Sequence, residues 1–219
     1  MPAPALQFHD VDRTRWDDLV QLFEARGGPK SCWCMLWRAA STEARRRDGQ
    51  HRKAALRSRV SSGEPIGILG YCDGTPVAWC SIAPRSTYRP LGGPDIDGDD
   101  RNAVWSIVCF FIKRELRSRH VCDQLLEAAI AHARKRGARI VEAYPVDASS
   151  PSYRFMGFVT MFRRFGFDEV GTAGTRRHVM RLSLTSQTGN ASRRHRRPRR
   201  SCPPAASSRP PARRPRRPG

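Results

Sequence analysis

Apolar residues in the first half of the chain recur first at helical and then at strand-like spacing. Between Trp16 and Phe23 they stand three or four positions apart, which is typical of an amphipathic helix. Two later β-prone runs flank Asp73-Gly74, a pair that supplies the positive φ angles of a tight hairpin turn. The aromatic run 32–37 fits either a strand or a bent helix. The elements predicted here are a short strand, two helices and two antiparallel strands, over residues 5–9, 16–23, 41–61, 66–71 and 77–82.

The second half contains a continuous apolar run, Val104–Ile112, which is typical of a central strand covered on both faces. An amphipathic helix over 116–136 is expected after it, ending at Gly137. The other elements predicted here are a strand, a helix and a closing antiparallel pair, over 139–144, 152–165, 167–171 and 178–184. The order β, α, α, β, β, β, α, β, α, β, β argues for an α/β (α+β) fold, with a mixed sheet and helices on both faces.

Composition separates this domain from the end of the chain. The 219 residues carry a formal net charge of +20, and residues 191–219 hold eleven arginines, seven prolines and no acid. Such a segment buries too little apolar surface to offset the entropy of folding, so 1–185 is the expected domain and 186–219 a disordered Arg/Pro-rich basic tail. The tail either binds nucleic acid weakly and non-specifically through its charge or is a solvated extension without a dedicated role.

Neither a membrane segment nor a metal site is expected. The chain lacks an apolar run near the ~20 residues of a membrane helix, and Met1–Asp10 lacks the features of a signal peptide, so a cytoplasmic protein with no membrane partner is expected. The seven cysteines form an odd set and are interpreted as reduced, partly buried thiols. Cys32 and Cys34, even with His9 or His51, do not have the ligand spacing of a structural zinc site.

Several segments resemble a known superfamily. Val104–Ile112, the basic turn 114–120 and the helix after it resemble the core of the GNAT superfamily, the acetyl-CoA-dependent N-acetyltransferases. Met161–Phe167 is similar to that superfamily's Y-x-x-x-G-F junction between helix and strand. The resemblance covers about residues 5–184 and is more specific to a bacterial subgroup without an assigned substrate. The segments that carry this narrower likeness are 32–35 (CWCM), 83–85, 105–110 and 141–146.

The resemblance implies a cofactor site. In such proteins a β-bulge separates the fourth strand from the fifth, the pantetheine arm pairs with the exposed backbone, and the pyrophosphate sits on amides at the next helix N-terminus. Of the family pattern [Q/R]-x-x-G-x-[G/A] this chain keeps Arg117, whereas His120 and Cys122 replace small residues. His120 either crowds the phosphate or adds a donor beside it. The residues expected to bind acetyl-CoA as co-substrate are Phe110, Phe111, Ile112, Arg117, Arg119, His120, Val121, Cys122 and Asp123.

The sequence identifies the catalytic residues less clearly than the cofactor residues. Phe162 stands where many members of the superfamily place a tyrosine that protonates the CoA thiolate, so Tyr153 is the candidate substitute, unless it only packs. Glu142 is the candidate base for the acceptor amine, directly or through water, unless it pairs with arginines. Cys109 is interpreted as a small hydrophobe because direct transfer needs no covalent intermediate. Four tryptophans either line an acceptor pocket or pack in the core: Trp33, Trp37, Trp79 and Trp105.

Two functions are therefore considered. The first is an N-acetyltransferase that moves an acetyl group from acetyl-CoA directly to an amine of a small molecule or a protein. The second is a catalytically weak relative that binds CoA or nucleic acid as an adaptor, which the basic tail and the altered turn support. The acceptor cannot be predicted because its side of the fold would be built from the uninterpretable segments 27–61 and 84–102. The oligomeric state is open, with a homodimer among the alternatives.

Overall fold

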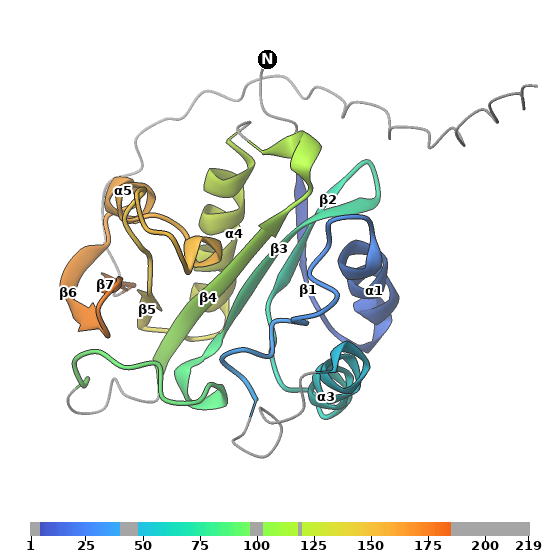
Figure 1. Cartoon of the computed structure of the whole chain (residues 1–219), viewed down its shortest axis with the longest axis horizontal. Coiled ribbons are helices and arrows are strands. Elements are labelled where there is room, and N and C mark those ends of the chain that lie inside the picture. The colour runs from blue at the N-terminus through green and yellow to red at the C-terminus, as the bar shows by residue number, and fades with distance from the viewer. Residues whose placement is uncertain (1–4, 40–47, 97–102, 118–119, 185–219) are drawn as a thin grey trace, which may run out of the picture.

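Strands from both halves of the chain join in one sheet in the computed structural model, which describes residues 5–39, 48–96, 103–117 and 120–184 (Figure 1). The strands of this described part are β1 (Gln7–Asp10), β2 (Ile68–Cys72), β3 (Thr75–Pro84), β4 (Val104–Ile112), β5 (Ile140–Ala143), β6 (Asp168–Ala173) and β7 (Arg177–Ser183). The α-helices are α1 (Trp16–Glu24), α3 (Gly49–Ser61), α4 (Val121–Lys135) and α5 (Val159–Arg164). The short 3-10 helices are η1 (Arg13–Arg15), η2 (Arg85–Thr87), η4 (Arg114–Leu116) and η5 (Arg154–Met156).

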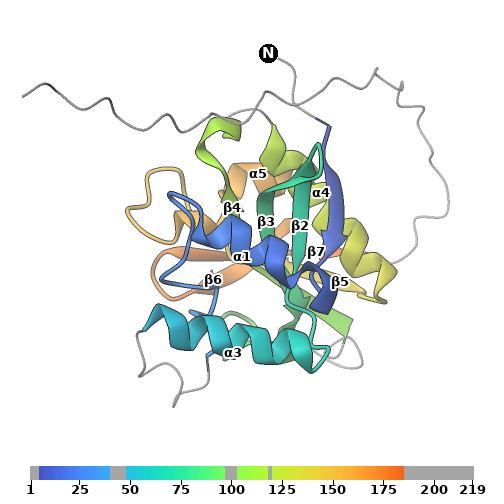
Figure 2. The ribbon, with the colours of Figure 1, turned by 90° about the vertical axis from the view of Figure 1, so that its right-hand side faces the viewer.

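The sheet has the order β1-β2-β3-β4-β5-β7-β6 and is mostly antiparallel, with a parallel pairing between β4 and β5. Helices cover both faces: in Figure 2, α1 and α3 lie in front of the strands, whereas α4 and α5 lie behind them. The predicted order of strands and helices and the predicted mixed sheet are therefore confirmed.

Two turns adopt the left-handed backbone that their sequences predict. Asp73 and Gly74, between β2 and β3, have φ angles of 48° and 74°, as a tight hairpin turn requires. Gly137 follows α4 with a φ of 84° and stops the helix there. In both places the local residues determine where one element ends and the next begins.

The central strand contains the expected β-bulge. Ser81 of β3 is opposite Cys109, but the next residue, Ile82, is opposite Ile107, so Val108 is the extra residue. β5 pairs with β4 only over Val104–Ile107. The first five residues of β4 are buried and the last four half-buried, which agrees with the loss of a neighbouring strand.

Three apolar clusters stabilise this arrangement through burial of their side chains. The first lies between the sheet and the helices α4 and α5, and the second lies under α1 and α3. The third cluster forms where β4 and β5 separate. Its buried members are Trp37, Ala83, Tyr88, Leu91, Val108, Tyr144, Met156, Ala173 and Val179, and Cys109 and Tyr153 pack against it half-buried.

The predicted helix 152–165 is wrong. Only Val159–Arg164 forms an α-helix, preceded by the separate 3-10 helix η5. Tyr153 and Gly157 have φ angles of 59° and 90°, a backbone that an α-helix does not allow. A Cβ atom at Gly157 would lie 2.8 Å from the ring of Phe162, so this glycine also permits close packing.

Other element boundaries also differ from the prediction. α3 begins at Gly49, because the side chain of Asp48 accepts hydrogen bonds from the amides that start the helix; residues 40–47 lie outside the described part. α4 begins at Val121, after a separate 3-10 helix. The run 32–37 forms turns, with Trp33 and Cys34 at φ angles of 48° and 50°, rather than a strand or a helix.

The description ends at residue 184, so the predicted tail 186–219 lies outside it and the division of the chain there stays a prediction. Within the described residues, every helix is too short or too polar to span a lipid bilayer.

Candidate functional site

The backbone of β4 loses its second neighbour beyond the bulge. After β5 the chain turns away from β4, and Val146 forms an isolated parallel bridge with Phe158 instead. Val108–Ile112 therefore have β3 on one side and no strand of the described chain on the other. We call this stretch the open edge of β4. The family resemblance predicts that pantetheine would pair with this kind of backbone edge.

The turn after the open edge leads into α4. Leu116 is buried and anchors η4, and the Arg117 Nε donates a hydrogen bond to the Ile112 carbonyl oxygen at 3.0 Å. Arg119 lies outside the described residues. The first backbone bond of α4 joins the Gln124 amide to the His120 carbonyl, which leaves the preceding amides without helical acceptors. Together with the helix dipole, these amides form a site suited to an anion.

His120 adopts the backbone that a glycine would adopt more easily. It has a φ of 55° at the start of α4, and its side chain is 77% exposed. Its Nδ1 lies 3.5 Å from an Asp123 carboxylate oxygen. Asp123 also pairs with Arg164 of α5, at 2.7 Å. The imidazole is therefore held beside the turn by a weak contact, and the left-handed backbone explains why small residues are usual at this position in the superfamily.

The other candidate cofactor residues surround the open edge. Phe110 and Phe111 point to opposite faces of the sheet, and their ring centroids lie 6.2 Å from Phe162 and 6.4 Å from Phe23, respectively. The Cys122 thiol donates to the Met161 sulfur, and burial raises its pKa to about 11, so it stays protonated near neutral pH. The structure thus brings the end of β4 and the start of α4 together.

Glu142 is fully buried and surrounded by donors. Its Oε2 lies 2.8 Å from the Arg181 Nε, and its Oε1 lies 3.4 Å from the Arg85 Nε. The Tyr144 hydroxyl also donates to Oε1. Burial, reinforced by the Glu142 charge, raises the pKa of Tyr144, so its hydroxyl remains a donor. These contacts match the alternative in which Glu142 pairs with arginines, and any proton that it accepts must pass one of these partners.

Residues 30–158, which include β2 to β5, α4 and η5, match the acetyltransferase (GNAT) family. The chain belongs to this family. Membership of the GNAT family implies acyltransferase activity. The family match does not test membership of the narrower bacterial subgroup, so that membership stays a prediction.

Solved structures with the GNAT fold are similar to the chain over most of its length. The PaiA N-acetyltransferase from Thermoplasma acidophilum, in complex with coenzyme A, is 14% identical, with a TM-score of 0.51 over 82% of this chain and 99% of its own. A GCN5-related N-acetyltransferase from Kribbella flavida is 20% identical, with a TM-score of 0.50 over 82% and 98%. At such identities the likeness concerns the fold. No curated protein matches the chain in sequence.

Tyr153 lies in the part of this GNAT fold where β4 and β5 separate. It is half-buried, and its ring lies 6.3 Å from Trp37 and 6.2 Å from Phe155. The Arg177 guanidinium stands 5.6 Å from the ring centroids of both Tyr153 and Tyr144. Tyr153 is therefore linked to Glu142 through two intervening side chains, Arg177 and Tyr144.

Several residues of this region were missed from sequence. Arg85 comes from η2, and Arg177 and Arg181 both come from β7; in an arginine-rich chain nothing in the sequence distinguishes them from solvated arginines. The alternation of β7 was a usable signal, because residues 177, 179 and 181 must share one face of the strand. Of the four tryptophans, Trp37 alone belongs to the third cluster, whereas the others pack in the first and second clusters.

The thiol closest in sequence to the bulge is a poor nucleophile. The Cys109 thiol is hydrogen-bonded to Cys34, and this contact, with burial, raises the pKa of Cys109. Trp79 donates to the same Cys34 sulfur at 3.1 Å. The three side chains form a packed contact under the sheet. In the described residues, no group of three or more His, Cys, Asp and Glu side chains is arranged to hold a metal ion.

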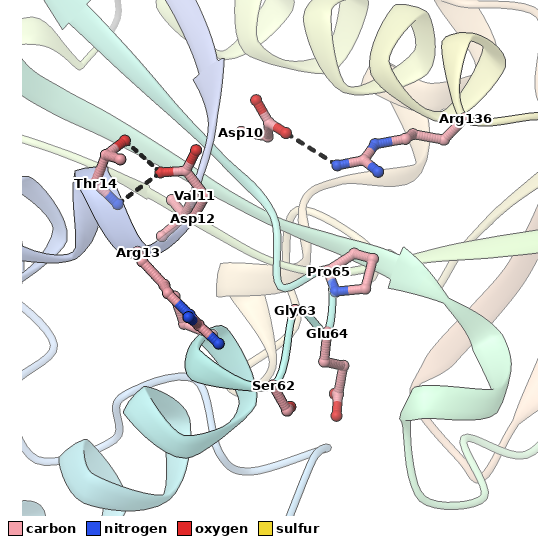
Figure 3. A pocket seen from close by; sticks show the side chains of 11 residues that line it. Asp10, Val11, Asp12, Arg13, Thr14, Ser62, Gly63, Glu64, Pro65 and Arg136 are labelled. Carbon is pink, nitrogen blue, oxygen red and sulfur yellow. Dashed lines mark hydrogen bonds and ion pairs between the residues drawn. The ribbon is translucent and has the colours of Figure 1, made fainter.

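One cavity of about 400 Å³ lies far from these residues (Figure 3). Asp10 and Arg136 face each other across part of it, with a nitrogen–oxygen distance of 2.9 Å. Arg136 caps the C-terminus of α4, and fifteen helical residues separate it from His120, a distance of about 22 Å. This cavity is therefore not part of the predicted cofactor site. Another cavity, of about 360 Å³, lies between the loop 147–151 and the β6–β7 hairpin.

Proposed function

We propose that this GNAT protein transfers the acetyl group of acetyl-CoA directly to a primary amine. The observation that carries the proposal is the open edge of β4 beside the N-terminus of α4. A strand edge without a neighbouring strand suits the amides of pantetheine, and free helix amides suit a pyrophosphate. The coenzyme A bound by the Thermoplasma acidophilum protein, which shares the fold, supports this choice of co-substrate.

The proposed cofactor contacts divide between backbone and side chains. The backbone of Val108–Ile112 would pair with the pantetheine arm, and the amides of 121–123 would bind the pyrophosphate. Arg117, which already lies against the end of β4, and Arg119 would add positive charge. Most of this site needs no particular side chain, so the replacements at His120 and Cys122 are compatible with binding.

The proposed chemistry is a single acyl transfer. The neutral amine attacks the thioester carbonyl carbon, the carbon–sulfur bond breaks, and the CoA sulfur leaves as a thiolate. Tyr153 is the proposed donor of a proton to that sulfur. The amine proton is proposed to pass through the Tyr144 hydroxyl, which gives its own proton to Glu142. Both proton transfers then involve residues next to the third cluster.

Measurement of free thiol released from acetyl-CoA across a panel of amines tests this function. We expect release that depends on the amine, with a matching acetylated product by mass spectrometry. CoA binding without turnover on any amine would instead favour the adaptor function. The aliphatic control Val121→Ala keeps the amide of the α4 turn and should retain activity.

The predicted tail is a separate part of this proposal. We expect removal of 186–219 to leave turnover and melting temperature unchanged and to abolish any salt-sensitive nucleic-acid binding. Nucleic-acid binding by 1–185 that is sequence-selective and insensitive to salt would contradict this and favour the adaptor function.

A further inference from the structure

Arg177, the first residue of β7, is enclosed by aromatic rings. Its guanidinium carbon lies 4.4 Å from the ring centroid of Trp37 and 5.6 Å from those of Tyr144 and Tyr153. Burial lowers the pKa of Arg177, but an arginine side chain remains positively charged at neutral pH. A full positive charge is therefore held among aromatic side chains.

Two donors in this arrangement are buried without an acceptor. The Arg177 Nη1 and the Trp37 Nε1 make no hydrogen bond with any of the described residues. The Trp37 side chain belongs to a residue that is only 8% exposed. Leaving a buried donor unpaired costs about 1–3 kcal/mol, and more when the group is charged. An acceptor that binds here would recover that free energy.

Two other arginines of this molecule have hydrogen-bond or ion-pair partners. Arg181, two residues further along β7, pairs with Glu142 at 2.8 Å. Arg154 also lies over an aromatic ring, at 4.9 Å from Phe158, but its Nη1 donates to backbone carbonyls.

Arg38 also has buried guanidinium nitrogens without a hydrogen bond, but its Nη1 lies 3.6 Å from the Glu64 carboxylate and its Nη2 donates to three oxygens. For Arg177 the structure records ring contacts but, among the described residues, no carboxylate within ion-pair distance.

The location of Arg177 is consistent with an acceptor site. Val108, the bulge residue at the open edge of β4, belongs with Trp37 and Tyr144 to the third cluster. Arg177 also lines the cavity of about 360 Å³ beside the β6–β7 hairpin. On the other side, Arg89 lies 5.4 Å from the Trp37 ring and adds positive charge. The nearby carboxylate of Glu142 is already matched by two arginines.

We propose that Arg177 and the indole N–H of Trp37 bind a carboxylate of the acceptor, so that the substrate is a small amine of amino-acid type. This inference rests on the acetyl transfer proposed above. A carboxylate is planar and offers two oxygens, which suits a guanidinium and a neighbouring N–H donor. With its carboxylate on Arg177, the substrate directs its amine toward the open edge of β4, where the thioester is expected.

Paired acceptors test the inference on the full-length protein. Glycine, L-alanine and L-phenylalanine are each compared with their carboxamides as acetyl acceptors. The carboxamides have the less basic amines, because a carboxylate stabilises a neighbouring ammonium group, so simple amine reactivity favours them. We expect the wild-type protein to prefer the carboxylates by about tenfold or more in kcat/KM.

The variant Arg177→Met should abolish that preference. We expect a rise of about ten- to a hundredfold in the KM of the carboxylate acceptors, little change for the carboxamides, and partial recovery in Arg177→Lys. Arg134→Met is the matched control, because it removes the same charge from an exposed position on α4. It should leave the preference unchanged.

Other outcomes would overturn the inference. Equal use of carboxylates and carboxamides, or a preference that survives in Arg177→Met, would remove the carboxylate site. Preference for O-phosphoethanolamine over every carboxylate would assign a different anion. If no amine is acetylated, the proposed acetyl transfer is wrong, but the carboxylate site can still be tested. Calorimetry then compares the binding of N-acetylglycine with that of N-acetylglycinamide. Carboxylate-dependent binding that Arg177→Met abolishes would support the site, and its absence would overturn it.

Discussion

The turn at the start of α4 and the region around Glu142 differ in which part of each residue forms the site: the backbone in the turn and the side chains around Glu142. The turn provides backbone amides and a helix dipole, and its side chains make only peripheral contacts, such as the 3.5 Å approach of His120 to Asp123. Around Glu142 the contacts are made by side chains: Arg85, Arg181 and Tyr144 surround its buried carboxylate.

This difference explains how each region tolerates change. A backbone site survives replacement of the residues that display it, as long as the turn and the helix form. A network of buried charges does not survive the replacement of its residues, because removal of one charged group leaves the others unpaired in an apolar environment. The region around Glu142 should therefore be the more sensitive to single substitutions.

The largest effect is expected for Tyr153→Phe. If the Tyr153 hydroxyl protonates the CoA sulfur, its loss should lower kcat by about 10²- to 10⁴-fold. The ring contacts with Trp37 and Phe155 need no hydroxyl, so acetyl-CoA affinity and the melting temperature should remain unchanged. Pre-steady-state thiol release and calorimetry measure the two quantities. A change in kcat of only a few-fold would mean that solvent supplies the proton.

Glu142→Gln should destabilise the protein. The substitution leaves two arginines, 24% and 16% exposed, around a neutral amide, so we expect a loss of about 2–4 kcal/mol in the free energy of unfolding. Urea denaturation measures it, with Glu127→Gln on the exposed face of α4 as the control. If Glu142 also accepts the amine proton, the acidic limb of the kcat/KM profile should shift as well. An unchanged profile would leave Glu142 a structural role only.

The two regions also differ in how well sequence predicts them. The strand that carries the open edge and the helix after the turn follow from the apolar run Val104–Ile112 and from the helical pattern that ends at Gly137, because both signals are local. The bulge that creates the open edge is implied only by the family resemblance. The partners of Glu142 could not be found that way. Arg181 is 39 residues away from Glu142 in sequence, and an arginine-rich chain offers many equivalent candidates.

The failed helix 152–165 has a similar cause. Its apolar residues recur at helical spacing, but Gly157 has to approach the Phe162 ring closely, and Tyr153 takes a left-handed backbone to reach the third cluster. Tertiary packing therefore overrides the local pattern. The aromatic run 32–37 could not be assigned for the same reason, since Trp33 and Cys34 are placed by turns.

Val121→Pro tests the turn by removing an amide. The substitution deletes a donor at the first position of α4, a place where a proline does not break the helix, but it also disfavours the backbone of His120. We expect acetyl-CoA to bind about 10- to 100-fold more weakly. Calorimetry on the folded variant measures this, beside Val121→Ala. Undiminished affinity would remove the turn from the cofactor site.

His120→Gly should have a smaller effect on the same turn. Glycine adopts the φ of 55° without strain, so the turn should form at least as easily. If His120 only crowds the phosphate, acetyl-CoA affinity should stay the same or rise by about threefold, which corresponds to roughly 0.7 kcal/mol. A tenfold loss would show instead that the imidazole contacts the phosphate, and the turn would then depend on a side chain after all.

The smallest effect concerns the pH dependence of stability, which has opposite signs for two histidines outside the two regions. His178 contacts Glu169 at 2.6 Å and Asp147 at 3.2 Å, and its hydrogen bond to Glu169 is the main reason that its pKa is raised. The folded protein then binds more protons than the unfolded one above about pH 6.5. The stabilising contribution of His178 is complete below that pH and is lost as the pH rises through the raised pKa of His178.

His132 of α4 behaves in the opposite way, because burial lowers its pKa. Its contribution is present above about pH 6.5 and is lost as the pH falls through the lowered value. Urea unfolding between pH 5 and pH 8 should therefore show that His178→Gln removes stability mainly at the acidic end, by less than about 1 kcal/mol, whereas His132→Gln relieves a loss there. Equal slopes in both variants would mean that neither histidine senses its neighbours.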